Sequence, residues 1–256
     1  MKKTAIALAA IAAVGMGTAS AQDYQMEAGV GYTHISPDVG SSDNAFDVDF
    51  TYYLDRVATA NKPLAEAAFL SQASGITVGY ANVDKADVDT IGISGEFYFD
   101  QLYIAAGYAA ADFSGIDVDT LSARVGWMLQ DGLRVAAGID RVDVDVPGSS
   151  ASNDIVLEGK YVADLGGGTA FNAEATITFL DQADDTVFAI GGDYYLNPAL
   201  SFGAGLSFAD DKKSDGTNWN LRARYFVTPV ISVQAEYFTA NDGDDDAFRL
   251  SAALRF

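Results

Sequence analysis

Several residue types are missing or scarce in this chain of 256 residues. It has no cysteine, which excludes disulfides and thiolate metal sites. It has 15 Lys and Arg against 36 Asp and Glu, and the resulting net charge of −21 argues against nucleic acid as a partner, because phosphate binding needs clustered basic side chains. After the N-terminal region, no apolar run is long enough for a membrane helix. If the chain lies in a membrane, it must therefore cross it as strands.

Histidine is also scarce, and this weighs against an enzyme. A hydroxyl nucleophile at neutral pH needs a positioned base, and His34 is the only histidine. Ser36 is too close to His34 in sequence to share a suitable face, and the chain contains no G-x-S-x-G turn. We therefore expect no catalytic residues and no cofactor. The Asp-Val-Asp repeats and the acidic run 242–246 could bind a divalent cation weakly, but a solvated strand extension is the favoured interpretation, and no metal site is predicted.

The N-terminal residues have the pattern of a secretory signal. A basic start at Lys2 and Lys3 precedes a short apolar stretch, and the small residues of 19–21 form a cleavage site. The apolar stretch is too short to span about 30 Å of hydrocarbon. We expect residues 1–21 to be removed and residues 22–256 to form a single domain.

The last residues alternate between apolar and polar. Phe248, Leu250, Ala252, Leu254 and Phe256 fall on one side of a strand, which is the period of a transmembrane barrel strand. Such a strand is stable only in a closed barrel, because an open edge in hydrocarbon leaves backbone groups unpaired. Turn signals divide the chain into fourteen such segments, with twelve as the alternative: 24–36, 44–54, 74–83, 87–99, 101–112, 116–129, 132–143, 153–163, 169–180, 185–196, 199–209, 217–227, 230–239 and 246–256.

The connections between these segments are of two kinds. Tight turns at 100–101, 130–132, 164–168, 197–198 and 228–229 are assigned to the periplasmic side. Longer acidic connections at 36–44, 82–86, 142–153, 181–185, 209–216 and 239–246 are assigned to the outside. The sequence thus predicts an all-β, antiparallel, up-and-down transmembrane barrel.

A periplasmic insert breaks this pattern between the second and third segments. Residues 55–73 contain a turn at 61–63 followed by a short helix, in which Leu64, Ala67, Ala68 and Phe69 form one apolar face. We expect this insert to pack at the inner mouth of the barrel, and a gating or partner-binding role is the alternative.

The stretch from Tyr52 to Ser74 is specific enough to suggest a family. Its aromatic strand end runs into Pro-Leu-Ala-Glu-Ala-Ala-Phe-Leu, at 63–70, and resembles the corresponding segment of general porins from marine gammaproteobacteria. The signal, the Asp-Val-Asp repeats and the terminal Phe256 are similar too. The resemblance implies an outer-membrane porin of a Gram-negative bacterium, without indicating its solute.

The alternation also predicts which side of each strand faces lipid. Apolar sets such as 200, 202, 204, 206 and 208 face outward, and aromatic girdles close both ends, the inner one comprising Tyr24, Tyr52, Phe97, Phe99, Tyr194, Tyr225 and Phe256. Ionisable residues on the opposite faces would cost a few kcal/mol each on a lipid face, so they require a wet interior. The predicted pore-lining and selectivity residues are Glu27, Asp47, Asp49, Glu96, Arg124, Arg134, Glu158, Lys160, Glu174, Asp193, Arg222, Arg224, Glu236 and Arg249.

We interpret the chain as a general diffusion porin. Acids of the first strands and guanidinium groups of Arg124, Arg134, Arg222, Arg224 and Arg249 would form two opposed sets, and the acidic rim would favour cations. The alternative is a structural or adhesive barrel whose lumen is closed by salt bridges. Expected partners are outer-membrane lipid, lipopolysaccharide, small hydrophilic solutes, and the barrel-assembly machinery through Phe256. A monomer is favoured over a trimer, because the lipid-facing sets show no strip of small residues.

Overall fold

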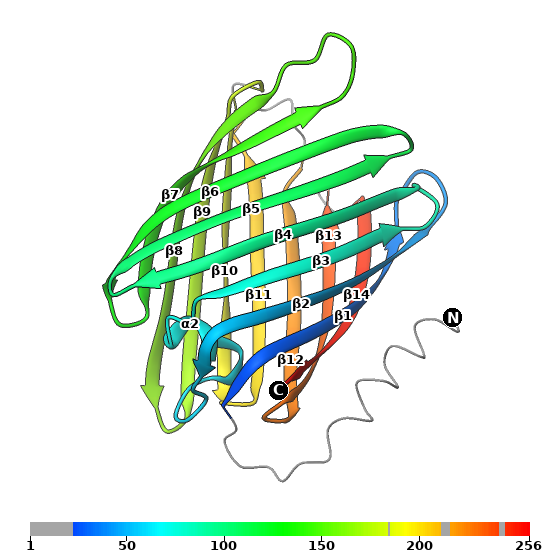
Figure 1. Ribbon diagram of the computed structural model, residues 1–256. Helices are drawn as coiled ribbons and strands as arrows, with labels where there is room; N and C mark the ends of the chain where they lie inside the picture. The colour runs from blue at the N-terminus through cyan, green and yellow to red at the C-terminus, as the bar shows by residue number, and fades with distance from the viewer. Residues whose placement is uncertain (1–22, 184, 211–215, 241–243) are drawn as a thin grey trace.

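The computed structural model is a closed antiparallel barrel in which each strand pairs with its neighbours in sequence and β1 pairs with β14 (Figure 1). The structure describes residues 23–183, 185–210, 216–240 and 244–256. The strands are β1 (Tyr24–Ser36), β2 (Asp43–Val57), β3 (Gly75–Val83), β4 (Val88–Phe99), β5 (Leu102–Phe113), β6 (Ile116–Gln130), β7 (Leu133–Val144), β8 (Ser152–Gly166), β9 (Thr169–Leu180), β10 (Asp185–Asn197), β11 (Leu200–Ala209), β12 (Asn218–Thr228), β13 (Ile231–Ala240) and β14 (Asp245–Arg255). The predicted fold and the count of fourteen strands are confirmed.

Large apolar side chains cover the outside of the barrel. On β11, Phe202, Leu206 and Phe208 are exposed, and on β14 the same holds for Phe248 and Leu250. These residues recur at every second position, so each strand presents one apolar face. No helix in the described ranges is long and apolar enough to cross a membrane.

The connections at the two ends of the barrel differ less in length than the sequence predicted. At the end that carries the insert, the five predicted tight turns are present. At the opposite end, which we call the loop end, the connection between β5 and β6 is also tight. It consists of Ser114 and Gly115, with φ values of 53° and 88°, as a two-residue hairpin turn requires.

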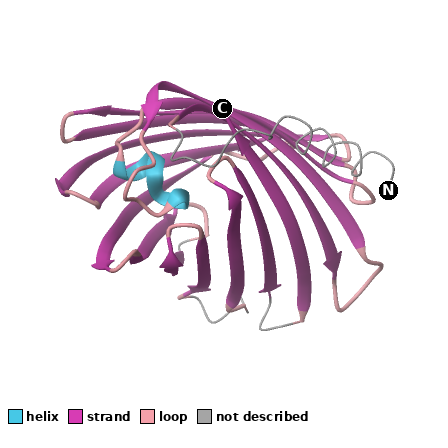
Figure 2. Cartoon of the chain, turned by 90° about the horizontal axis from the view of Figure 1, so that it is seen from below, coloured by secondary structure: helices cyan, strands magenta, loops and turns pink. Residues whose placement is uncertain are grey.

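The predicted insert forms a 3-10 turn, η1 (Leu64–Glu66), and a short helix, α2 (Ala67–Leu70). Seen along the barrel, α2 lies within the outline of the strands at one mouth (Figure 2). Ala67 packs against Tyr24 and Val57, and Phe69 packs against Met128 and Val162. The insert therefore contacts opposite parts of the wall and lies across this mouth, which we call the insert end.

Tyr24 does not belong to the aromatic girdle in which the sequence placed it. Its side chain is 1% exposed and packs edge-on against Tyr53, beneath the insert. The register of β1 against β2 shifts between Tyr24 and Met26, and this bulge turns the side chain inward. The prediction failed because strict alternation assumes an uninterrupted ladder.

The expected monomer rested on the absence of a strip of small residues from the lipid-facing side. The structure contradicts this observation, because small residues do occur on the outer face. Gly159, Ala173, Ala175 and Ala204 line a shallow groove of about 610 Å³ across β8, β9 and β11. The oligomeric state therefore stays a prediction without that support. The predicted signal, residues 1–21, lies outside the described residues.

Candidate pore-lining site

Contacts with the insert identify the inner face of the wall. Lys160 binds Glu66 of the insert, Arg255 donates a hydrogen bond to the carbonyl of Leu64, and Phe69 lies against Met128. Every second residue of these strands shares that face. By this criterion and the strand registers, all fourteen predicted pore-lining residues lie on the inner face.

Three arginines on the inner face reach across an intervening strand to a carboxylate. Arg249 on β14 spans β1 and binds Asp47 on β2 through two bonds of 2.6 and 2.7 Å. Arg222 on β12 spans β11 and binds Asp193 on β10 at 2.6 Å. The third arginine, Arg124 on β6, spans β7 to bind Glu158 on β8 at 2.9 Å.

A glycine lies beneath each of these arginines. Gly31 lies under Arg249, Gly203 under Arg222 and Gly138 under Arg124, and a Cβ atom at any of them would collide with the charged side chain above. The absence of a side chain on the spanned strand lets each ion pair lie flat. The charges therefore cover the wall without crossing the lumen.

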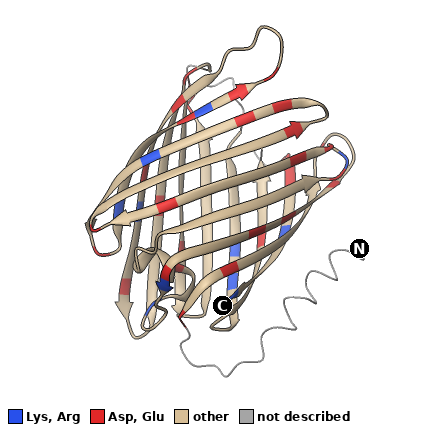
Figure 3. Cartoon of the chain, in the orientation of Figure 1, with Lys and Arg blue, Asp and Glu red and all other residues tan. Residues whose placement is uncertain are grey.

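The ion pairs do not form the two opposed sets, one of acids and one of arginines, that the sequence predicted. Arg249 with Asp47, and Arg134 with Glu96 at 3.6 Å, join the acids of the first strands to the predicted arginines. The remaining predicted arginines bind elsewhere: Arg124 binds Asp140 and Glu158, Arg222 binds Asp193, and Arg224 donates to Gln234. Charged segments accordingly occur on strands around much of the barrel (Figure 3).

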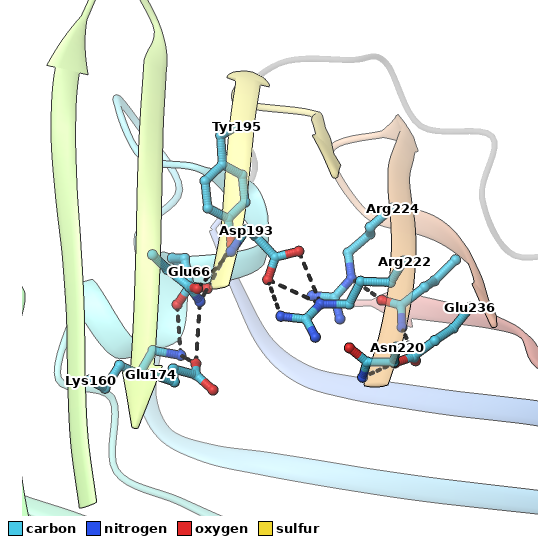
Figure 4. A network of polar contacts seen from close by, with 11 residues as sticks. Glu66, Lys160, Glu174, Asp193, Tyr195, Asn220, Arg222, Arg224 and Glu236 are labelled. Carbon is cyan, nitrogen blue, oxygen red and sulfur yellow. Dashed lines mark hydrogen bonds and ion pairs between the residues drawn. The ribbon is translucent and has the colours of Figure 1, made fainter. Parts of the chain in front are cut away.

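Glu66 anchors the insert to the inner wall (Figure 4). Its carboxylate lies 2.9 Å from the Lys160 ammonium and accepts hydrogen bonds from Tyr195 at 2.7 Å and Asn172 at 2.6 Å. Lys160 also binds Glu174 at 2.8 Å. Burial would raise the pKa of Glu66, but the Lys160 ammonium and the two hydrogen bonds outweigh burial and hold this pKa below its usual range. Glu66 is therefore ionised at neutral pH and bound on both oxygens.

Sequence reasoning missed several residues of these networks, among them Glu66, Asp140, Asn172 and Tyr195. Asp140 lies six residues after Arg134 on the same strand. Because successive side chains of a strand alternate between its two faces, this even separation places Asp140 on the inner face of β7. Glu66 is the only acid in the otherwise apolar run 63–70, and this was the available signal. Its partners come from β8, β9 and β10, which lie about a hundred residues away in sequence.

Carboxylates outnumber their ion-pair partners on the inner face. Among the residues that the structure describes, Asp49 has no basic nitrogen within 4 Å, and Glu236 is bound only by the amides of Asn220 and Gln234. Arg224 is the corresponding cation, bound by a neutral side chain. The inner face is thus polar, charged and acidic in balance.

The family model described as "Putative general bacterial porin" matches residues 1–145 and 139–256. The chain belongs to this family. Its structure is similar to the crystal structure of the Acinetobacter baumannii outer membrane protein Omp33, with a TM-score of 0.78 and 28% identity, covering 93% of this chain and 100% of that one. Family and structure together place this porin in the outer membrane.

Two more distant likenesses concern the fold alone. A bacterial polysaccharide outer membrane secretin has a TM-score of 0.54 and 13% identity, and a triple mutant of the Rhodopseudomonas blastica porin has a TM-score of 0.50 and 10% identity. Each covers 91% of this porin and 99% of its own chain. No curated protein matches the chain.

Proposed function

We propose that this porin is a general diffusion channel that passes small hydrophilic solutes and ions, with a preference for cations. The observation that carries the proposal is the course of the ion pairs: they lie along the wall over Gly31, Gly138 and Gly203 and leave the lumen uncrossed. A barrel of fourteen strands is too wide for its own side chains to fill. The insert end would face the periplasm, and the lipid and lipopolysaccharide of the outer membrane would surround the apolar face.

The cation preference rests on the balance of charge. Asp49 and Glu236, which have no ion-pair partner among the described residues, add negative potential to the lumen, while most basic groups are neutralised by close carboxylates. A pore lined by fixed negative charge concentrates cations and repels anions. An enzymatic role remains disfavoured, since the single histidine, His34, lies beside Asn44 near the loop end of β1.

A structural barrel with a closed lumen is the second candidate, and the insert is the specific observation in its favour. It occupies the insert end and is fixed there by Glu66, Leu64 and Phe69. Under the channel proposal the insert only narrows this mouth, whereas under the alternative it seals it.

Liposome swelling separates the two candidates. Vesicles containing the refolded chain, residues 22–256, are diluted into isotonic solutions of sugars of increasing size. A channel predicts swelling that slows as the sugar grows, and a sealed barrel predicts swelling no faster than in protein-free vesicles. A variant in which residues 60–72 are replaced by a short Gly-Ser turn is the control: swelling by this variant alone would favour the sealed barrel.

A further inference from the structure

One sector of the inner wall, formed by β3, β4 and β5, carries mostly small side chains, and we call it the smooth sector. All residues of these three strands are described, and Glu96 is the only charged side chain on their inner face. The other inward residues at mid-height are small, including Gly79, Gly92, Ser94 and Gly107. Ser94 is exposed although it faces inward. This sector therefore leaves space that the charged side chains fill elsewhere.

The surroundings of the glycines support this difference. A Cβ atom would meet its nearest neighbour at 3.6 Å at Gly79, 3.5 Å at Gly92 and 3.4 Å at Gly107, all of which are ordinary contacts. At Gly31 and Gly203, by contrast, charged side chains already occupy the Cβ position. The inner face of β3, β4 and β5 is thus uncovered at these glycines, whereas charged side chains cover the inner face of β1 at Gly31 and of β11 at Gly203.

At the insert end this open sector leads into a cavity of about 260 Å³ between the insert and the wall. Glu66 and Phe69 line it on the side of the insert, and Thr77, Ser94 and Glu96 line it on the side of the wall. We call this cavity the throat. It adjoins the smooth sector at Thr77 and Ser94.

Exposure decides which charge a solute in the throat would meet. The Glu96 side chain is 55% exposed, whereas those of Arg134 and Lys160 are 13% and 21% exposed. The Arg134 guanidinium lies 3.9 Å from the centre of the Tyr103 ring, and Lys160 lies between Glu66 and Glu174. Arg134 and Lys160 are therefore largely covered, Arg134 lying 3.6 Å from Glu96 itself, and the most exposed of these three charges is the Glu96 carboxylate.

We propose that solutes cross this porin along one side, over the smooth inner face of β3, β4 and β5, and pass the insert through the throat, where Glu96 selects for cations. The inference rests on the proposed channel function. It adds the course of the pathway and the position of the selecting carboxylate, neither of which follows from the barrel alone.

The absence of cysteine makes a direct test available, because any introduced thiol is unique. Ser94→Cys places a thiol in the throat, and Ser251→Cys places one on the inner face of β14, away from the proposed pathway. Each variant is refolded into a planar bilayer and treated with a cationic and an anionic methanethiosulfonate of similar size. Single-channel conductance and reversal potential are recorded before and after modification, and mass spectrometry verifies labelling.

Modification of Ser94→Cys is expected to reduce the conductance to about half or less, because the adduct narrows the pathway where it is narrowest. The cationic adduct should shift the reversal potential toward anion preference, and the anionic adduct should shift it the other way. Modification of Ser251→Cys should change the conductance by less than about a tenth, since solute passes at a distance. Equal block at both positions, or no effect of verified labelling at Ser94→Cys, would overturn the proposal.

A replacement variant and a second measurement keep a failure of the throat proposal distinguishable from a failure of the channel proposal. If Ser94→Cys does not fold, as judged by heat-modifiable migration, Thr77→Cys takes its place in the throat. If the unmodified protein carries no current, the proposed channel function fails, and the rates at which a membrane-impermeant maleimide labels the two cysteines in vesicles then test the throat. Faster labelling at position 94 would support an accessible throat, and equal or slower labelling would contradict it.

Discussion

Glycine has opposite consequences in two parts of the inner wall, one formed by β3, β4 and β5 and the other by β10, β11 and β12. At Gly107 the missing side chain leaves lumen space, with only ordinary contacts around the Cβ position. At Gly203 the space of the missing side chain is occupied by Asp193 and by Arg222, whose Nε lies 2.7 Å from the position that a Cβ atom would take. A glycine on the inner face of a barrel strand therefore indicates an open path only if the neighbouring strands carry no side chain long enough to cover it.

The insert can be compared with the walls in the same terms. The flat ion pairs stabilise strands that are already joined by backbone hydrogen bonds, whereas the contacts of Glu66 hold a segment that has no strand neighbours. Changes at Glu66 should therefore alter the channel more than changes within the wall, and four predictions follow that comparison from the largest effect to the smallest.

The largest effect is expected from Glu66→Ala. This substitution leaves Lys160, Tyr195 and Asn172 without their shared acceptor, so the insert loses its charged contact with the wall and is held less tightly. Single-channel conductance should rise about two-fold or more as the throat widens. Glu174→Ala is the matched control, since it removes a carboxylate from the same lysine without touching the insert. An unchanged conductance in Glu66→Ala would contradict the anchoring role.

Acidification should reproduce that effect more weakly. Because the pKa of Glu66 lies below its ordinary value of 4.5 when the insert is docked, the stabilisation by ionised Glu66 is complete above that value and is lost as the pH falls through the lowered pKa. Conductance recorded from pH 7 downward should therefore stay constant down to 4.5, the ordinary pKa of a glutamate, and rise only at lower pH. The same titration on Glu66→Gln should show no such rise, and a rise of equal size would assign the effect to another group.

The third prediction concerns selectivity in the throat. Glu96→Gln should lower the ratio of cation to anion permeability about two-fold, because it removes the exposed charge and leaves the side-chain volume nearly unchanged. Asp119→Asn, on the outer face where Asp119 binds Tyr108, should leave the ratio unchanged. Reversal potentials in a salt gradient provide the measurement. Equal effects of the two variants would show that the overall charge, rather than the throat, determines selectivity.

The smallest effect is expected from alanine at the two kinds of glycine. Gly203→Ala forces the Asp193 and Arg222 pair to shift and should cost about 1 kcal/mol of unfolding free energy. Gly107→Ala meets only ordinary contacts and should cost close to nothing. Urea unfolding in lipid vesicles measures both. If the two variants were equally stable, the glycines beneath the ion pairs would not be needed for packing.

The sequence was most informative where the chain obeys one simple period. Alternation through Phe248, Leu250 and Phe256 predicted the last strand and its lipid face, because each strand of a barrel has one face in lipid and one in water. Alternation failed at Tyr24, where a bulge reverses the side chain. It also assigned Arg249 and Asp47 to the inner face without indicating that they pair with each other.

The pairings were beyond reach for a physical reason. Two residues on strands separated by a third strand meet only for a particular stagger of the barrel, and stagger is a property of the closed sheet. The same applies to Glu66, whose partners on β8, β9 and β10 are set by how the insert enters the barrel. The sequence identified the charged side chains and their face, and the structure supplied their partners and the uncovered sector.

The central claim, that this porin forms an open and cation-preferring channel, is tested most directly by the single-channel current of the refolded, unmodified chain in a planar bilayer under a salt gradient. The account predicts steady conductance steps and a reversal potential whose sign corresponds to net cation flow toward the dilute side. The absence of current from protein shown to be folded by heat-modifiable migration, or a reversal potential of the opposite sign, would contradict it.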